Sequence, residues 1–222
     1  MVKIWIVLAY IVGIIVLFFS YAFEFVKYGQ TGSEKYSFLR NFPYELNQFK
    51  IDSSKSYILA IIEILGSCLF SVASLFFAIN YQNVNPTSAY ILFAVSTFVI
   101  LCFNVLRFVK LRNYRLHLLL TSIFVVSNLL LLLLYYFFFT NSDYGYAMIN
   151  GVRITEIILI LLLIIFEFFL MLNPTYKNWY KLVKIEADVY SRPKFCYLPI
   201  LEWGNFLIYL LSFIPLFIVV FF

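Results

Sequence analysis

Six long apolar segments fill most of this 222-residue chain and limit what it can fold into. A helix needs about 20 apolar residues to cross a hydrocarbon core of roughly 30 Å, and only helices and closed barrels satisfy every backbone hydrogen bond in lipid. We therefore expect an all-α membrane protein in which residues 1–222 form a single bundle. The segments predict transmembrane helices near residues 4–23, 57–80, 87–106, 117–139, 152–172 and 203–222.

The composition agrees with a membrane protein. Hydrophobic residues make up 64% of the chain and charged residues 12%, whereas a soluble domain carries roughly 25% charged residues. So few charged side chains could not cover a surface that faces water. Contacts with lipids are therefore expected over the outside of the bundle.

The basic residues are distributed unevenly among the five connections between the segments. Of the 16 Lys and Arg residues, 14 lie in the first, third and fifth connections. Basic residues in short connections stay on the inner face of a membrane, so both termini are expected on the outer, non-cytoplasmic or intermembrane side. The net charge of +5 is then a topology signal and does not indicate nucleic-acid binding. The 14 residues are Lys27, Lys35, Arg40, Lys50 and Lys55, then Arg107, Lys110, Arg112 and Arg115, and finally Lys177, Lys181, Lys184, Arg192 and Lys194.

Three glutamates fall inside the predicted helices, where an ionised group costs at least a few kcal/mol. Glu63 and Glu167 lie at a similar depth from the inner face, and Asn104 and Arg107 at the inner end of the third segment are available partners. We predict that these four residues form a polar cluster, while Glu156 shares a helix face with Glu167. The cluster fits either a proton relay or ion site, or a hydrogen-bonded group that fixes helix packing.

The second segment also carries a stripe of small and polar residues at helical spacing, formed by Glu63, Ser67, Ser71, Ser74 and Ala78. Small side chains let helix backbones approach closely, and serines hydrogen-bond between helices in membranes. The stripe therefore predicts a helix–helix interface.

No catalytic residue, metal site or cofactor is predicted. The three cysteines show no C-x-x-C spacing, and none of the common nucleotide-binding, zinc-protease or serine-hydrolase motifs occurs. The single histidine, His117, is expected at the membrane interface where the fourth segment starts. The sequence thus gives no basis for an enzyme activity of this chain alone.

The fifth connection contains an amphipathic pattern. An apolar stripe that includes Trp179 lies opposite Lys177, Lys181 and Lys184 when the segment is drawn as a helix. Such a pattern is typical of a helix that lies in the membrane interface. It would equally suit packing on a neighbouring subunit.

The first connection carries the run Pro43-Tyr44-Glu45. With an outer N-terminus, an inner connection of about thirty residues and two closely spaced helices, residues 1–110 resemble subunit 3 of NADH:ubiquinone oxidoreductase, complex I. The resemblance implies that Pro43, Tyr44 and Glu45 lie near a quinone site or a subunit contact. Leu46 stands where that family has a cysteine, and Ala73 and Leu75 stand roughly where it has acidic residues.

These observations favour a non-catalytic membrane subunit of a large energy-transducing complex of the respiratory-chain type. The chain has 27 Phe and 18 Tyr, as AT-biased organellar or bacterial genomes tend to produce, and it has short connections and no soluble domain. Its expected partners are other membrane subunits and lipids. Its expected location is the mitochondrial inner membrane, with a bacterial plasma membrane as the alternative. The competing function is a small six-helix transporter, or a membrane component of one, for a metabolite or ion.

Overall fold

The computed structural model describes residues 2–31, 36–39, 41–46, 56–81, 86–109, 113–140, 150–172, 183–186, 189–191 and 197–221. The helices are α1 (Val2–Thr31), α3 (Ser56–Tyr81), α4 (Pro86–Leu106), α5 (Tyr114–Thr140), α7 (Asn150–Met171), α8 (Tyr197–Leu211) and α9 (Phe213–Phe221). A short antiparallel hairpin, β1 (Val183–Glu186) and β2 (Val189–Ser191), precedes α8.

Six helical segments in these residues are long and apolar enough to cross a membrane, as the sequence predicts. The last segment, Tyr197–Ile218, combines α8 with most of α9. The helix breaks at Ser212 because the ring of Pro215 clashes with the carbonyl of Leu211 and Pro215 has no N–H to bond it. This helix starts six residues earlier than the predicted residue 203.

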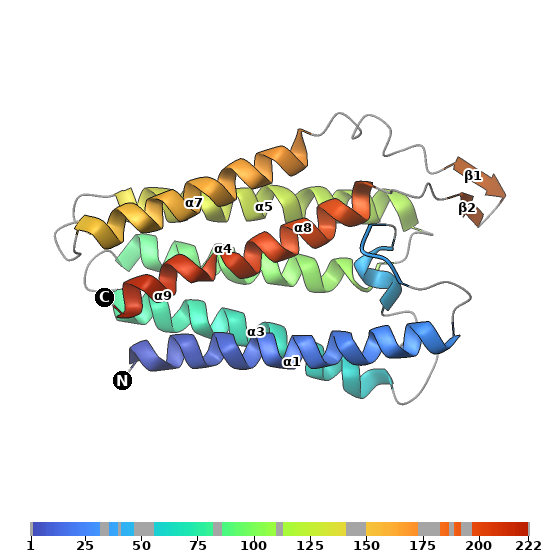
Figure 1. The fold of residues 1–222 in the computed structure, drawn as a ribbon, viewed down its shortest axis with the longest axis horizontal. Coiled ribbons are helices and arrows are strands. Elements are labelled where there is room, and N and C mark those ends of the chain that lie inside the picture. Colours follow the sequence, from blue (N-terminus) through green and yellow to red (C-terminus); the bar gives the residue numbers. More distant parts are fainter. Residues whose placement is uncertain are drawn as a thin grey trace.

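Both described ends of the chain lie at the same end of the bundle (Figure 1). At the opposite end α1, α4 and α7 finish, and α3, α5 and α8 begin. We call this opposite end the loop-rich end, because the first, third and fifth connections join the helices there. An even number of crossings requires this arrangement.

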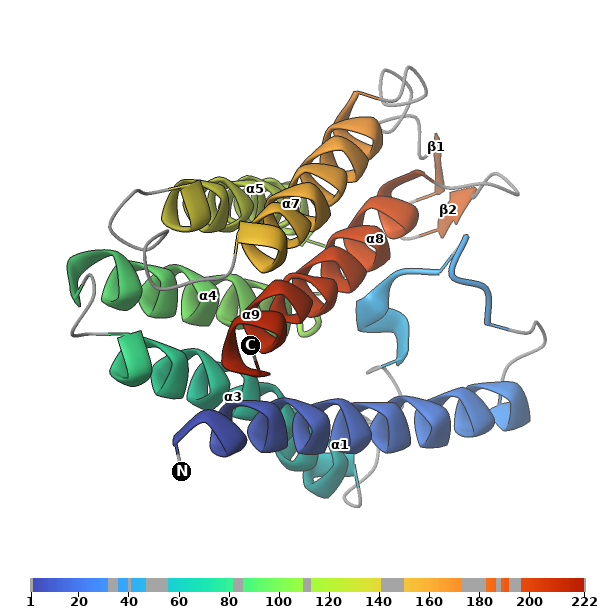
Figure 2. The same ribbon diagram turned by 60° about the vertical axis from the view of Figure 1, so that its left-hand side comes forward.

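The helices pack largely in chain order, with α1 against α3, α3 against α4, α4 against α5 and α5 against α7. The last two helices close the bundle, since α8 contacts α5 and α7 while α9 contacts α1 and α7. Figure 2 shows this final pair running between α7 on one side and α1 on the other. The last segment therefore touches helices from both halves of the chain.

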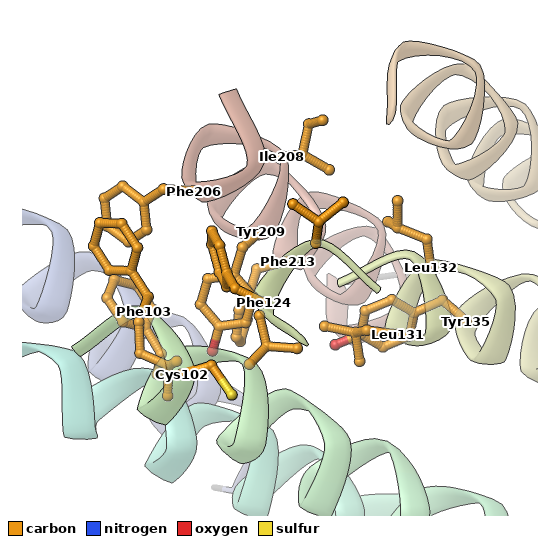
Figure 3. Packing of buried hydrophobic residues seen from close by; sticks show 14 of the residues in the cluster. Cys102, Phe103, Phe124, Leu131, Leu132, Tyr135, Phe206, Ile208, Tyr209 and Phe213 are labelled. Atoms are coloured by element: carbon orange, nitrogen blue, oxygen red, sulfur yellow. The ribbon is translucent and has the colours of Figure 1, made fainter. Parts of the chain in front are cut away.

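Aromatic side chains fill the centre of the bundle. Phe103 of α4 stacks on Phe206 of α8 with ring centroids 4.0 Å apart (Figure 3). Tyr209 and Phe213 of the last segment pack edge to face beside them. Stacked and edge-to-face ring pairs stabilise the packing of the last segment by more than the burial of their surface area alone.

The last segment also makes polar contacts inside the bundle. Asn128 of α5 donates to the carbonyl of Asn205 at 3.1 Å. The Tyr209 hydroxyl donates to the carbonyl of Ser96 at 3.2 Å, and on α1 the Tyr10 hydroxyl donates to the carbonyl of Leu210 at 2.8 Å. Three different helices are thus hydrogen-bonded to the last one.

The stripe of small residues on α3 faces α4. The Ser74 and Ser96 hydroxyls lie 2.9 Å apart, and Asn104 donates to the Ser67 hydroxyl at 2.7 Å. Ala78 is fully buried. These contacts agree with the predicted helix–helix interface.

The predicted interfacial helix in the fifth connection is wrong over residues 183–186 and 189–191, which form the strands β1 and β2. Val183 pairs with Ser191 and Lys184 pairs with Tyr190. Strand β1 alternates apolar and polar residues, and both strands contain β-branched residues, which favours a strand over a helix. Lys177, Trp179 and Lys181 lie outside the described residues.

Candidate functional site

A buried arginine joins three parts of the chain at the loop-rich end. Arg107 follows α4 directly and is 1% exposed. Its Nη2 lies 3.0 Å from Oε2 of Glu24 in α1, and its Nη1 forms an ion pair with Oε1 of Glu63 in α3. The guanidinium also lies over the ring of Tyr21, 4.4 Å from its centroid. We call Glu24, Arg107 and Glu63 the arginine triad.

Burying three ionisable groups is costly, because each loses several kcal/mol of hydration that only well-placed partners offset. The two acidic residues are 3% and 4% exposed, so water screens them little. When all three side chains of the triad are ionised, the three groups together carry a formal charge of −1. The gain or loss of one proton would therefore change the charge of the arginine triad by one full unit at a site that water screens little.

The structure divides the polar cluster predicted from sequence. Glu63 and Arg107 are paired, but Asn104 bonds to Ser67 of α3. Glu167 is fully buried on α7, and neither of its carboxyl oxygens has a hydrogen-bond partner among the described residues. The reason is the packing order, because α7 lies against α5, α8 and α9. Equal depth in the membrane did not bring Glu167 to the arginine triad.

Glu156 also lies on α7 and is fully buried, with no hydrogen-bond partner for either carboxyl oxygen in the described part of the chain. It occupies the same helix face as Glu167 and lies three turns away, as predicted. Both carboxyl groups therefore face protein.

A second buried ionisable pair joins α5 to α8. Nε2 of His117 lies 2.9 Å from Oε1 of Glu202, and the Thr121 hydroxyl donates to the same oxygen at 2.8 Å. Nδ1 of His117 lies 3.0 Å from the carbonyl of Val109. His117 lies near the start of α5, and its side chain is fully buried inside the protein. We call His117 and Glu202 the histidine dyad.

Residues 41–46, which contain the Pro-Tyr-Glu run, form a buried segment with one helical turn at 43–46. Pro43 occupies the first helical position, where a missing N–H costs nothing. Oε2 of Glu45 accepts the N–H of Phe42 at 2.8 Å and the Nδ2–H of Asn41 at 3.0 Å. A glutamate that reaches back to the residue before the helix forms half of a capping box. Pro43 and Glu45 thus have local structural roles.

The same segment covers the histidine dyad. The rings of Phe42 and Tyr44 meet the imidazole of His117 edge to face, with centroids 5.3 and 5.5 Å away. Figure 2 shows this part of the chain, in light blue, between α1 and α8. Pro43, Tyr44 and Glu45 are therefore buried within the protein.

Tyr36 connects the buried segment to α8, because its hydroxyl accepts the indole N–H of Trp203 at 3.1 Å. Burial raises the pKa of the Tyr36 hydroxyl well above its usual value, while the hydrogen bond from Trp203 lowers it. The charges of Glu45 and Glu202 raise this pKa and that of Arg107 lowers it. Tyr36 therefore lies within electrostatic reach of both the arginine triad and the histidine dyad.

Replacing Glu45 with Ala is expected to loosen the buried segment, with a loss of about 1 kcal/mol in stability, typical of a lost helix cap. The donors on Asn41 and Phe42 would lose their shared acceptor. Trp203 reports the change, so we expect its fluorescence emission to shift to longer wavelength in a chain whose Trp5 and Trp179 are changed to Phe. Glu45→Gln keeps an acceptor oxygen and should stay close to the parent. Equal shifts in the two variants would contradict the capping role.

Sequence reasoning missed Glu24, Thr121 and Glu202. Glu24 was assigned to the first connection, and Glu202 falls one residue before the predicted start of the last helix. Extending each helix into its flanking residues would have placed both acids inside the membrane, where they require partners. Their basic partners in the structure are Arg107 for Glu24 and His117 for Glu202.

The site does not indicate a metal centre within the described ranges, where no three His, Cys, Asp or Glu side chains gather as a metal ion would require. No protein family model, curated protein or solved structure matches this chain.

Proposed function

We propose that this protein is a non-catalytic integral membrane subunit of a large energy-transducing complex of the respiratory-chain type. In this function its buried ionisable groups hold and pass protons at the loop-rich end. The observation that carries the proposal is the arginine triad together with the histidine dyad. Their acids and His117 lie in helices long enough to span a membrane, and Arg107 follows the end of such a helix. Ionisable groups inside such helices are costly and usually mark ion paths and proton relays.

The buried segment supports a path between the two groups. Tyr36 is within electrostatic reach of both groups, since the charges of Arg107 and Glu202 both act on its hydroxyl. A tyrosine hydroxyl can both donate and accept a proton in a hydrogen-bonded chain. Tyr36 is therefore the group that the proposed path would use between the arginine triad and the histidine dyad.

The outer surface suits a subunit that is covered by neighbours and lipid. The α7 span is only 28% buried within the chain, compared with 56% for the last span. Its outward side carries large apolar groups such as Ile165, Phe169 and Leu172, which are 63–75% exposed. A face of this kind needs an apolar surrounding, which lipid or a neighbouring membrane subunit supplies.

The orientation and the membrane are part of the proposal. The loop-rich end is assigned to the inner side because 14 of the 16 Lys and Arg residues belong to its connections. The mitochondrial inner membrane is favoured over a bacterial plasma membrane on the strength of the resemblance of residues 1–110 to subunit 3 of complex I. Because Pro43 and Glu45 also begin a helical turn, the function rests on the buried charges and not on that run.

The second candidate function is a small six-helix transporter, or a membrane component of one, for a small metabolite or ion. The observation that favours it is the buried segment, which covers the histidine dyad as a gate would cover a binding site. The two functions differ in what accompanies the protein. A subunit needs its complex, whereas a transporter works alone or as a small oligomer.

The native size of the gently solubilised protein tests the choice. We expect a particle many times the mass of the chain that migrates with haem or flavin absorbance. A small particle that binds a metabolite would contradict the subunit proposal and select transport. Glu63→Gln tests the proton path, with Glu156→Gln as the matched control because Glu156 lies far along α7. We expect a loss of proton flux for Glu63→Gln alone, and unchanged flux with normal assembly would reduce Glu63 to a packing role.

A further inference from the structure

The hydrogen bonds of His117 determine where its protons are. The carbonyl of Val109 can only accept, so Nδ1, 3.0 Å away, must carry a hydrogen. Nε2 lies 2.9 Å from Oε1 of Glu202, and this contact needs one proton between the two atoms. Whether the pair is imidazolium with carboxylate or imidazole with carboxylic acid, it holds one shared proton and its total charge is zero.

The dyad has room for a second proton. Oε2 of Glu202 is buried and has no hydrogen-bond partner among the described residues. The Thr121 hydroxyl contacts only the other oxygen, Oε1. A buried acceptor without a donor is uncommon and costs free energy. Binding a proton at Oε2 gives this oxygen a covalent partner while Nε2–H continues to bond Oε1.

A cavity lies beside the dyad. It has a volume of about 210 Å³ and opens between α5, α7 and α8. Its wall includes Thr121, which bonds Glu202, and Leu201, the neighbour of Glu202. One water needs roughly 10–15 Å³ of such space, so the cavity has room for several waters. The hydroxyls of Thr121 and Ser122 supply polar contacts along it.

Among the described residues, two other sides of His117 are covered. The rings of Phe42 and Tyr44 pack edge-on against His117, and the Val109 carbonyl occupies its Nδ1. The charged groups that act on His117 are Glu202 on α8 and Glu45 on the buried segment, and both are acidic. When the dyad gains a proton, Glu202 itself becomes neutral, and Glu45 is the acidic group outside the dyad that acts on the positive charge of His117.

We propose that the histidine dyad is a proton-binding site loaded from the cavity between α5, α7 and α8. The proton comes from a hydronium ion in the cavity and ends on Oε2 of Glu202, which lies behind the wall that Thr121 and Leu201 form. One O–H bond of the hydronium ion breaks and leaves water, an O–H bond forms at Oε2, and the charge of the dyad changes from zero to +1. This inference rests on the proposed function in that it names the groups that take up the proton. It concerns the isolated chain and does not depend on which complex the chain joins.

The test is infrared difference spectroscopy of the purified full-length chain in lipid nanodiscs, recorded between pH steps. Acidification should increase the intensity of the carbonyl stretching band that a protonated carboxylic acid gives. This pH-dependent band should be absent in Glu202→Gln and present in Glu167→Gln, the matched control with an equally buried glutamate outside the dyad. A band that persists unchanged in Glu202→Gln would overturn the proposal.

Thr121→Val provides a second measurement that does not depend on removing the acid. It keeps the side-chain volume and removes the hydroxyl that donates to the charged carboxylate, which should favour protonation. We expect the pH midpoint of the band to move up by about one unit, a tenfold gain in proton affinity. An unmoved midpoint would show that Glu202 is not the titrating group. If the band behaves as expected but the native particle is small, the proton site stands and the subunit proposal fails.

Discussion

Replacing Arg107 with Met should destabilise the protein by about 3–5 kcal/mol, which is the usual cost of removing one partner from a buried ion pair. The acids Glu24 and Glu63 would remain buried without the guanidinium that contacts both. The contacts by which the end of α4 is joined to α1 and α3 would also be lost. Unfolding in mixed detergent, followed by helical circular dichroism, measures the effect. The stability of Arg107→Lys should fall between that of the parent protein and that of Arg107→Met, because an ammonium cannot present forked donors to two carboxylates as a guanidinium does.

The matched control for Arg107→Met is a variant that changes all three members of the arginine triad. Adding Glu24→Gln and Glu63→Gln removes the buried negative charges, and apolar or neutral replacement of whole buried ion pairs is often close to neutral. We therefore expect the triple variant to recover most of the lost stability. If the triple variant is no more stable than Arg107→Met, the loss comes from packing and not from uncompensated charge.

Replacing Gly66 with Ala should destabilise the contact between α1 and α3 by about 1–3 kcal/mol, the usual cost of overpacking. A Cβ at this position would lie 2.7 Å from Cγ1 and 3.2 Å from Cβ of Val16. A valine in a helix has one strongly preferred rotamer, so Val16 cannot turn aside. The backbone is equally close, because a Cβ on Gly13 would lie 3.1 Å from the Gly66 carbonyl oxygen. Helix α1 would have to move away from α3.

Gly204→Ala is the matched control, since it adds the same methyl group to another helix. Its Cβ would also lie 2.7 Å from a neighbouring atom, but that atom is Cδ1 of Leu170, at the end of a flexible side chain. We expect a change in unfolding temperature close to zero for Gly204→Ala and a clear decrease for Gly66→Ala. Similar decreases in both variants would mean that α1 and α3 are not packed more tightly than α7 and α8.

The sequence was sufficient for the number of helices but not for their partners. Apolar length fixes where a chain can cross a membrane, and all six predicted segments are present. The rotation of each helix about its axis, and the choice of neighbours, depend on packing that hydropathy does not report. Glu63 and Glu167 share a depth, yet only Glu63 reaches Arg107. His117 likewise could not be placed until α8 supplied Glu202.

Two local patterns had more than one physical interpretation. The residues of β1 fit both a helical amphipathic pattern and a strand alternation, and the β-branched Val and Ile residues favour the strand. The Pro-Tyr-Glu run resembles a family motif, but Pro43 and Glu45 are also the residues that begin a helical turn. In both places the short-range chemistry of the backbone decides the structure.

The contacts of the last segment have a consequence for biosynthesis. Helices that enter a membrane in order of translation leave the ribosome with α8 later than α1, α3, α4, α5 and α7. Until α8 arrives, His117, Asn128 and Tyr10 each lack the acceptor they use in the finished protein. The helices made before α8 are therefore in the membrane while these polar groups still lack the acceptors that α8 supplies. Helix α8 thus completes the polar contacts of the bundle. A nascent chain released before α8 is made would expose unpaired polar groups to lipid and be a target for membrane quality control.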